Sequence, residues 1–263
     1  MQAFKDAKAG EIRALKEMGR AELEQRARCE REAFRPPDFL GRLRDGRAAR
    51  GLAIVAEYKR ASPSRGEIEM GVTPEEAAEA YREADCISVL TEGSFFRGDL
   101  SFLPRMSFKG IPLLRKDFVF HPLQILDTAA RRASAVLLIS RLLAGVAELR
   151  ELMLLSRSAG LAPVVEVFGA AELEDARSAG AEIIQVNARD LDTLRVDFLA
   201  SLRLLEEHPG SPGEFFIAAS GLRDAVDLRL ARRLGFGGAL VGTSLMEGGR
   251  PAERLAGLLA GMA

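Results

Sequence analysis

The chain has 263 residues, of which 48% are hydrophobic and 29% are charged, and 37 basic against 38 acidic side chains give a formal net charge of −1. These totals allow one large α/β domain and argue against nucleic acid or a membrane surface as the main partner. Two cysteines argue against a disulfide framework, and the N-terminus lacks the apolar core of a signal peptide, so we expect a cytoplasmic protein.

The first 50 residues form a charged segment with scattered apolar positions. Residues such as Phe4 and Leu15 are spaced as in amphipathic helices, and two consecutive prolines interrupt the pattern. A segment this short with so few large apolar groups buries little core of its own. We therefore expect residues 1–50 to be an N-terminal helical extension that caps one end of a domain formed by residues 51–263.

The stretch 51–66 reads G-L-A-I-V-A-E-Y-K-R-A-S-P-S-R-G, an apolar strand followed by a loop of small hydroxyl residues. Because side chains alternate along a strand, Glu57 and Lys59 point to the same side. A carboxylate and an ammonium group thus stand together at the carboxyl end of a strand, where α/β enzymes place their chemistry. A structural ion pair that plugs a barrel end is the alternative interpretation.

The rest of the sequence alternates between apolar strands and helices. Thr73-Pro74-Glu75-Glu76 is typical of a helix start. The later strands are predicted at 86–91, 111–118, 135–139, 162–167, 183–187, 215–219 and 238–242, with helices at 73–81, 100–108, 123–132, 144–159, 170–179, 198–207, 223–234 and 251–259. Eight strands, each followed by a helix, predict a single (βα)8 TIM barrel of the α/β class. A doubly wound open sheet is the alternative, but no G-x-G-x-x-G motif follows any strand.

Polar side chains stand near the carboxyl ends of three of these strands. Lys116, Glu166 and Asn187 each interrupt an apolar run, and Arg189 follows two residues after Asn187. Lys116 or Glu166 alone is explained equally well by a structural salt bridge. In a barrel, however, all of these ends meet the charged pair of the first strand at one mouth, which favours a catalytic site.

Small residues follow the last two strands. Ser220-Gly221 comes after the seventh strand and Gly242-Thr243 after the eighth. The loops after these strands are the usual phosphate site of such barrels, and small residues let backbone N–H groups approach an anion. Ser62 in the first loop adds a hydroxyl donor. No metal-binding motif is present, so we expect no metal and no cofactor.

Six segments of the chain resemble indole-3-glycerol phosphate synthase of tryptophan biosynthesis. They are A-E-Y-K-R-A-S-P-S-R-G (56–66), I-S-V-L-T-E (87–92), L-R-K-D-F (114–118), V-V-E-V (164–167), V-N-A-R-D-L (186–191) and V-G-T-S-L-M (241–246). The charged helical preamble also looks like the extension of this family. The resemblance implies a carbon–carbon lyase that cyclises 1-(2-carboxyphenylamino)-1-deoxyribulose 5-phosphate to indole-3-glycerol phosphate, with loss of carbon dioxide and water.

The resemblance also implies a role for each catalytic residue. Ring closure needs an acid that protonates a carbonyl oxygen, and dehydration needs acid and base at the departing hydroxyl. By similarity, Lys116 is the main general acid and Glu166 is the second acid/base. Lys59 would hold the anthranilate carboxylate, Glu57 would orient the lysines and the sugar hydroxyls, and Asn187 would hydrogen-bond the substrate.

Further residues are implied to bind the substrate. Arg189 would support the carboxylates, and Phe118 would pack on the aromatic ring. The phosphate would be bound by Ser62, Ser220, Gly221, Gly242 and Thr243. The sequence leaves open whether the two ammonium groups lower each other's pKa or the glutamates outweigh that effect. We expect a small-molecule substrate and a monomer that associates at most weakly with other enzymes of the tryptophan pathway.

Two alternatives stay open, and one of them depends on a departure from the family pattern. Ala218-Ala219 precede Ser220 where the family usually has a glutamate, so we expect slower turnover. One alternative is a sugar-phosphate barrel like phosphoribosylanthranilate isomerase, although a cysteine commonly ends the first strand of that enzyme. The other is a catalytically weak paralogue that binds the ligand or a partner enzyme, with Ala219 as its only support.

Overall fold

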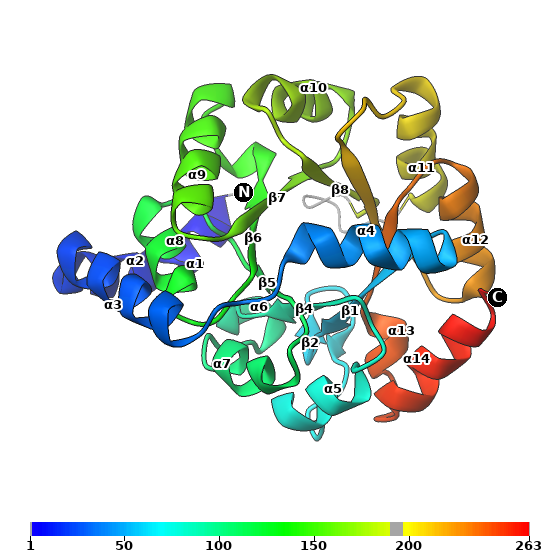
Figure 1. The fold of residues 1–263 in the computed structure, drawn as a ribbon, viewed down its shortest axis with the longest axis horizontal. Helices are drawn as coiled ribbons and strands as arrows, with labels where there is room; N and C mark the ends of the chain where they lie inside the picture. Colours follow the sequence, from blue (N-terminus) through cyan, green and yellow to red (C-terminus); the bar gives the residue numbers. More distant parts are fainter. Residues whose placement is uncertain (1, 190–196, 263) are drawn as a thin grey trace.

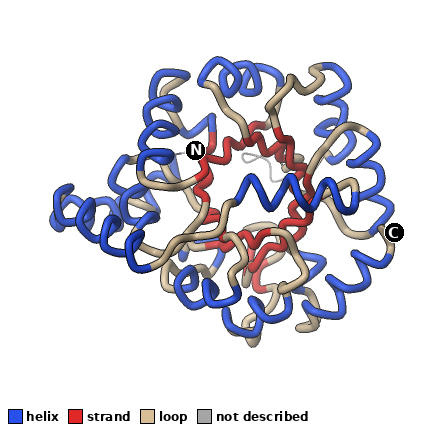
Figure 2. Tube along the Cα trace, in the orientation of Figure 1, coloured by secondary structure: helices blue, strands red, loops and turns tan. Residues whose placement is uncertain are grey.

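A computed structural model describes residues 2–189 and 197–262 of the chain (Figure 1). Eight parallel strands close into a barrel in the order β1-β10-β9-β8-β7-β6-β5-β4, and helices surround the ring of strands (Figure 2). The strands are β1 (Ala53–Tyr58), β4 (Cys86–Leu90), β5 (Leu113–Lys116), β6 (Ala135–Ile139), β7 (Ala162–Val167), β8 (Ile183–Asn187), β9 (Phe215–Ala219) and β10 (Gly238–Val241). The predicted TIM barrel is therefore confirmed.

The barrel closes because its first and last strands pair. Ala53 in β1 lies opposite Gly238 in β10, and β1 also pairs with β4 on its other side. Every residue of the eight strands is buried except Lys116 and Ala162, which are half-buried. One set of alternate side chains fills the barrel interior and the other set packs against the helices, so the strands are apolar on both faces.

The helices outside the barrel lie close to the predicted positions. They are α5 (Pro74–Ala80), α7 (Phe102–Met106), α8 (Pro122–Ala129), α9 (Val146–Ser158), α10 (Ala170–Ala179), α11 (Phe198–Glu207), α12 (Ala225–Arg233) and α14 (Pro251–Ala260). At the start of α5, the Glu76 amide donates to the Thr73 hydroxyl and the Thr73 amide donates to the Glu76 carboxylate. None of the helices within the described ranges is long and apolar enough to cross a bilayer.

The structure differs from the prediction mainly in short elements. It adds β2 (Ala61–Ser62), β3 (Gly66–Glu67), α6 (Gly93–Phe96), α13 (Thr243–Met246) and the 3-10 turns η1 (Ser107–Lys109) and η2 (Ser140–Leu142). The strand predicted at 111–118 is also too long, because β5 covers only Leu113–Lys116. Pro112 has no N–H for the ladder, and the Phe118 amide donates to the Asp117 carboxylate instead of to a neighbouring strand.

The N-terminal extension is helical throughout most of its length. Its helices are α1 (Gln2–Ala7), α2 (Ala9–Met18), α3 (Arg20–Ala33) and α4 (Phe39–Arg50). α4 crosses the end of the barrel where the strands begin (Figure 1), and it buries Phe39 and Leu43 in the interior layer. α2 and α3 pack on α8 along the side of the barrel. The division of the chain at residue 50 stays a proposal.

Candidate active site

A cavity of about 360 Å³ lies at the carboxyl ends of the barrel strands. All twelve residues predicted to form the site line this cavity: Glu57, Lys59, Ser62, Lys116, Phe118, Glu166, Asn187, Arg189, Ser220, Gly221, Gly242 and Thr243. Residues 190 and 191, which complete one of the six motif segments, lie outside the described residues. Among residues 2–189 and 197–262, no group of three His, Cys, Asp or Glu side chains is placed to hold a metal ion.

Glu57 and Lys59 form an ion pair at the end of β1. Lys59 Nζ lies 2.7 Å from Glu57 Oε1, and the Glu57 side chain is almost fully buried. Burial favours the neutral acid, but the charges of Lys59 and Lys116 outweigh it and lower the pKa of Glu57 below its ordinary value. A Cβ at Gly242 would overlap with the Glu57 carboxylate, so this glycine is needed to leave room for it.

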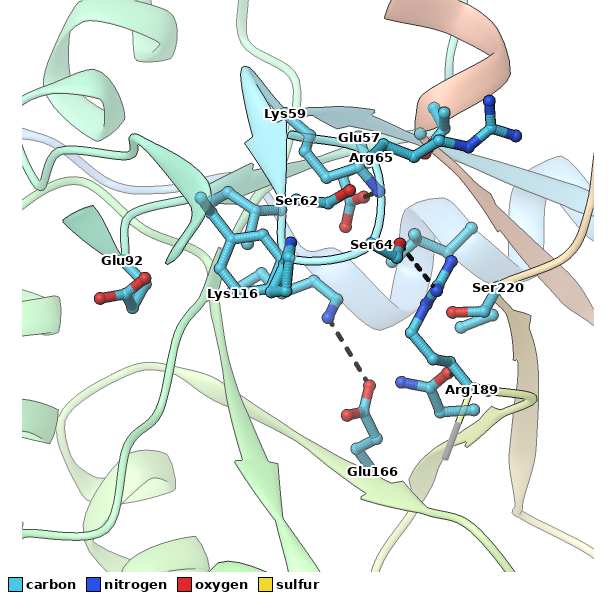
Figure 3. A pocket seen from close by; sticks show the side chains of 18 of the residues that line it. Glu57, Lys59, Ser62, Ser64, Arg65, Glu92, Lys116, Glu166, Arg189 and Ser220 are labelled. Carbon is cyan, nitrogen blue, oxygen red and sulfur yellow. Dashed lines mark hydrogen bonds and ion pairs between the residues drawn. The ribbon is translucent and has the colours of Figure 1, made fainter. Parts of the chain in front are cut away.

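Lys116 and Glu166 form a second pair across the cavity. Lys116 Nζ lies 3.7 Å from Glu166 Oε2 (Figure 3). The Gln185 side-chain amide donates a hydrogen bond to the same oxygen. Burial disfavours the ammonium form of Lys116, but the charges of Glu166 and Glu57 outweigh burial and raise its pKa above the ordinary value. The sequence left open whether the neighbouring ammonium group or the glutamates control the pKa of Lys116. The glutamates have the larger effect, so the Lys116 side chain is protonated at neutral pH.

Asn187 and Arg189 tie the loop after β8 to the loop after β1. The Arg189 amide donates to Asn187 Oδ1 at 2.9 Å, and Arg189 Nη1 donates to Ser64 Oγ at 2.9 Å. Figure 3 shows the Arg189 side chain pointing towards Ser64 beside Ser220. Burial lowers the pKa of Arg189, whereas the charge of Glu57 opposes that shift. The guanidinium group thus lies near the carboxylate of the first pair.

Phe118 belongs to a group of four aromatic rings at one side of the mouth. Its ring stacks on Phe4 with centroids 4.2 Å apart, and Phe95 and Phe96 approach it at 6.4 and 6.3 Å. Phe4 lines the cavity from α1, so the N-terminal extension reaches the end of the barrel opposite α4. The sequence around Phe4 does not point to the site, because the spacing of Phe4 resembles that of any apolar residue in an amphipathic helix.

Glu92 is a second lining residue outside the predicted site. Its side chain is buried, and its two carboxylate oxygens accept hydrogen bonds from the amides of Ser94 at 2.7 Å and Phe95 at 2.6 Å. Glu92 therefore caps α6, the short helix that carries two of the four aromatic rings. The signal in the sequence was an acid two residues beyond the end of β4.

The loops after β1, β9 and β10 form a rim of the cavity. The uncharged residues of this rim are Ser62, Ser220, Gly221, Gly242 and Thr243. Within the part of the chain that the structure describes, the buried Ser62 hydroxyl has no hydrogen-bond partner. Ser220 adopts a positive φ of 68° and Gly221 one of 85°, so the backbone turns sharply where β9 ends. An orphaned buried hydroxyl that lines the same cavity as such a turn can provide a hydrogen bond to an anionic ligand.

Comparisons with known proteins agree with this geometry. A family model for indole-3-glycerol phosphate synthase matches residues 1–257. The indole-3-glycerol phosphate synthase of Aquifex aeolicus (strain VF5) is 43% identical over 213 residues, which cover 80% of this chain and 82% of that protein. The enzyme of the same name from Mycolicibacterium gilvum (strain PYR-GCK) is 42% identical over 240 residues, which cover 90% of this chain and 85% of that protein.

Solved structures of low sequence identity share the barrel fold alone. A crystal structure of 3-hexulose-6-phosphate synthase has a TM-score of 0.65 at 15% identity and covers 81% of this chain and 100% of its own. Thiamine phosphate pyrophosphorylase from Pyrococcus furiosus has a TM-score of 0.57 at 16% identity and covers 80% of this chain and 95% of its own. Because the family model spans nearly all of the sequence and named relatives share about two-fifths of it, the chain belongs to the indole-3-glycerol phosphate synthase family.

Proposed function

We propose that the chain converts 1-(2-carboxyphenylamino)-1-deoxyribulose 5-phosphate to indole-3-glycerol phosphate, carbon dioxide and water. Family membership makes it a carbon–carbon lyase. The observation that carries the proposal is the meeting of two lysine–glutamate pairs, Lys59 with Glu57 and Lys116 with Glu166, in one cavity. Such pairs supply both proton donors and proton acceptors for a reaction that needs each in turn.

In the first step, the ring carbon that carries the carboxylate attacks the ketone carbon of the sugar chain. The new carbon–carbon bond turns the ketone oxygen into a hydroxyl, for which Lys116 supplies the proton. The raised pKa of Lys116 keeps this donor charged at neutral pH. Loss of carbon dioxide then leaves its bonding electrons in the ring, which restores aromaticity.

In the second step, the new hydroxyl leaves as water and the neighbouring carbon loses a proton. We assign this acid–base exchange to Glu166, and the distance of 3.7 Å between its carboxylate and Lys116 Nζ supports the assignment. The two groups can therefore pass one proton between them as the hydroxyl departs. Glu57 orients the lysines. Its ion pair with Lys59 and its close approach to Gly242, which limits the room for its carboxylate, support this role.

The remaining residues bind the carboxylate, the phenyl ring and the sugar phosphate of the substrate. Lys59 and Arg189 face the carboxylate, and the aromatic group around Phe118 packs against the phenyl ring. Asn187 hydrogen-bonds the substrate, while the phosphate lies at the rim. The rim residues in this assignment are Ser62, Ser220, Gly221, Gly242 and Thr243. The buried hydroxyl of Ser62 then gains the partner that it lacks among the described residues.

The proposal is tested by incubating the chain with this substrate in the presence of a chelator and following indole fluorescence. We expect product from the wild type and a fall in kcat of about 100-fold or more for Lys116→Ala, since a positioned general acid contributes about that factor. The matched control is Lys16→Ala, which removes an exposed lysine of α2. A Lys116→Ala variant within a few-fold of wild type would remove Lys116 from the acid role.

Two further measurements separate the alternatives. A wild-type chain that binds a substrate analogue by calorimetry but yields no product would be a catalytically weak paralogue, in keeping with Ala219 at the cavity wall. Turnover of phosphoribosylanthranilate instead would favour the isomerase. The cytoplasmic location and the monomeric state stay predictions from the sequence.

A further inference from the structure

A buried network of charges lies beside Lys116 but outside the chemistry proposed above. Its members are Arg115 and Asp117, which flank Lys116 in the sequence, together with Lys8 and Glu11 from the N-terminal extension. The Arg115 side chain is fully buried, and Lys8 and Asp117 are nearly so. Because side chains alternate along a strand, Arg115 lies on the opposite face of β5 from Lys116.

The network is closed by short contacts. Lys8 Nζ lies 2.6 Å from Asp117 Oδ1 and 2.7 Å from Glu11 Oε2. Arg115 Nη2 lies 2.9 Å from Asp117 Oδ2 and 2.8 Å from Glu11 Oε1, which is 104 positions away in the sequence. The Thr91 hydroxyl also donates to Asp117 Oδ2 at 2.6 Å. The Asp127 carboxylate lies 3.8 Å from Arg115 Nη1 and adds a third negative group. The two positive groups are thus compensated by carboxylates in a largely buried network, in which Glu11 keeps 17% of its side chain exposed.

Stability alone is a poor explanation for such a network. Buried ion pairs seldom stabilise a fold more than apolar side chains of the same size would, whereas they do fix one arrangement of the groups around them. Here the fixed element is the end of a strand. On the β6 side, the pairing of β5 stops at Arg115 with Val136, one residue before Lys116. On the β4 side it continues to Lys116 opposite Leu90.

The contacts of Asp117 take over where the pairing with β6 stops. The Asp117 carboxylate accepts the Phe118 amide at 2.8 Å and is itself held by Lys8 and Arg115. Beyond Lys116 the chain is therefore held through Asp117 by Lys8, which lies between α1 and α2, and no longer by pairing with β6. On the other side of Lys116, Glu11 of α2 holds the Arg115 side chain. If Lys8 is removed, one of the anchors of this turn is lost while the barrel ladder stays intact.

We infer that Lys8 and Glu11 are positioning residues, which hold the carboxyl end of β5 where Lys116 faces Glu166 and the substrate. This inference rests on the proposed role of Lys116. It assigns to the N-terminal extension a part in the chemistry in addition to covering the barrel. Neither residue lines the cavity, so each acts through Lys116 and not by contact with the substrate.

The test uses Lys8→Met and Glu11→Gln, each of which removes one charge and keeps most of the side-chain volume. We expect kcat to fall about tenfold in each variant, with KM within about threefold of wild type, because the proton donor is misplaced while the binding groups stay. Arg20→Met is the control, since it breaks an exposed ion pair with Glu24 in the same extension. Activity is measured well below the unfolding temperature of each variant, which circular dichroism supplies.

A double-mutant cycle separates positioning from a general loss of structure. In a Lys116→Ala background, Lys8→Met should cause no further loss of the residual kcat, because the group that it positions is gone. Losses that multiply in the double variant, or a folded Lys8→Met variant with wild-type kcat, would overturn the inference. A wild-type chain that forms no product would overturn the proposed function and this inference with it. If Lys116→Ala loses kcat while Lys8→Met and Glu11→Gln keep it, the inference is wrong and the proposed function stands.

Discussion

The negative charge of Glu57 acts on three cationic side chains at the mouth of the barrel. It pairs directly with Lys59, and it also raises the pKa of Lys116 and opposes the burial effect on Arg189. A single carboxylate at the end of β1 therefore helps to keep the proposed acid charged, although the nearest carboxylate to that acid is Glu166.

Glu57→Gln keeps the shape of the side chain and removes this charge. A general acid works in its protonated form, so its activity is lost as the pH rises through its pKa. Without Glu57 the pKa of Lys116 falls, and we expect the alkaline fall in kcat to begin at lower pH, with kcat near neutrality reduced about tenfold. The measurement is kcat against pH from about 6 to about 11 for both proteins.

Glu75→Gln is the matched control, because Glu75 forms an exposed pair with Arg105 away from the cavity. An alkaline limb that does not move in Glu57→Gln would show that the acid does not sense this carboxylate. The sequence suggested the pairing of Glu57 with Lys59 because side chains alternate along one strand. The contact of Glu57 with Gly242 joins the first and last strands and has no local pattern that predicts it.

At the scale of single elements, long apolar runs were predictable and short polar turns were not. β6, β7, β8 and β9 have the predicted bounds, because each is a mostly apolar run of five or six residues followed by polar or small residues or a helix start. α6 and α13 each have four residues, which is about one turn of helix and too few to show a period. Both border the cavity, so short, unpredicted elements shape part of the site.

The junction of β5 with Lys8 and Glu11 of the N-terminal extension gives a prediction about acid stability. Burial tends to raise the pKa of Asp117, but the charges of Arg115 and Lys8 outweigh it and hold the pKa at about 2. A carboxyl group whose pKa is lowered by folding stabilises the native state fully above its unfolded pKa of about 4, and this contribution is lost as the pH falls to about 2. The size of this contribution is on the order of 2 kcal/mol.

We expect the free energy of unfolding of the wild type to decrease between about pH 4 and about pH 2 more steeply than that of Asp117→Asn. Urea unfolding at a series of pH values measures both slopes. Asp45→Asn removes an exposed carboxylate of α4 and should keep the wild-type slope. Equal slopes for Asp117→Asn and wild type would mean that Asp117 does not titrate with folding.

At the scale of the whole molecule, the two ends of the barrel have different tasks. The carboxyl ends of the strands carry the polar residues of the cavity. At the amino ends, α4 crosses the barrel (Figure 1) and closes it with the apolar side chains of Phe39 and Leu43. The convergence of the site was predictable because every parallel strand of a barrel ends at the same mouth. The reach of α1 to that mouth was not, since it depends on how the extension wraps around α8.

This division predicts that stability and catalysis can be changed separately. Leu43 of α4 is fully buried in the interior layer at the amino end. Leu43→Ala should lower the free energy of unfolding by about 2–5 kcal/mol through lost burial and the cavity it leaves. We expect kcat and KM to stay within about twofold of wild type below the unfolding transition, since the chemistry lies at the other end.

Urea unfolding and steady-state kinetics on the same preparation measure the two effects. Leu154→Ala is the matched control, because Leu154 lies 57% exposed on α9 and its truncation should change stability by less than about 0.5 kcal/mol. If folded Leu43→Ala lost kcat in proportion to its stability, the amino end would be coupled to the cavity through the barrel strands. Stability that falls while kcat holds would instead show that α4 supports the fold and leaves the reaction to the opposite mouth.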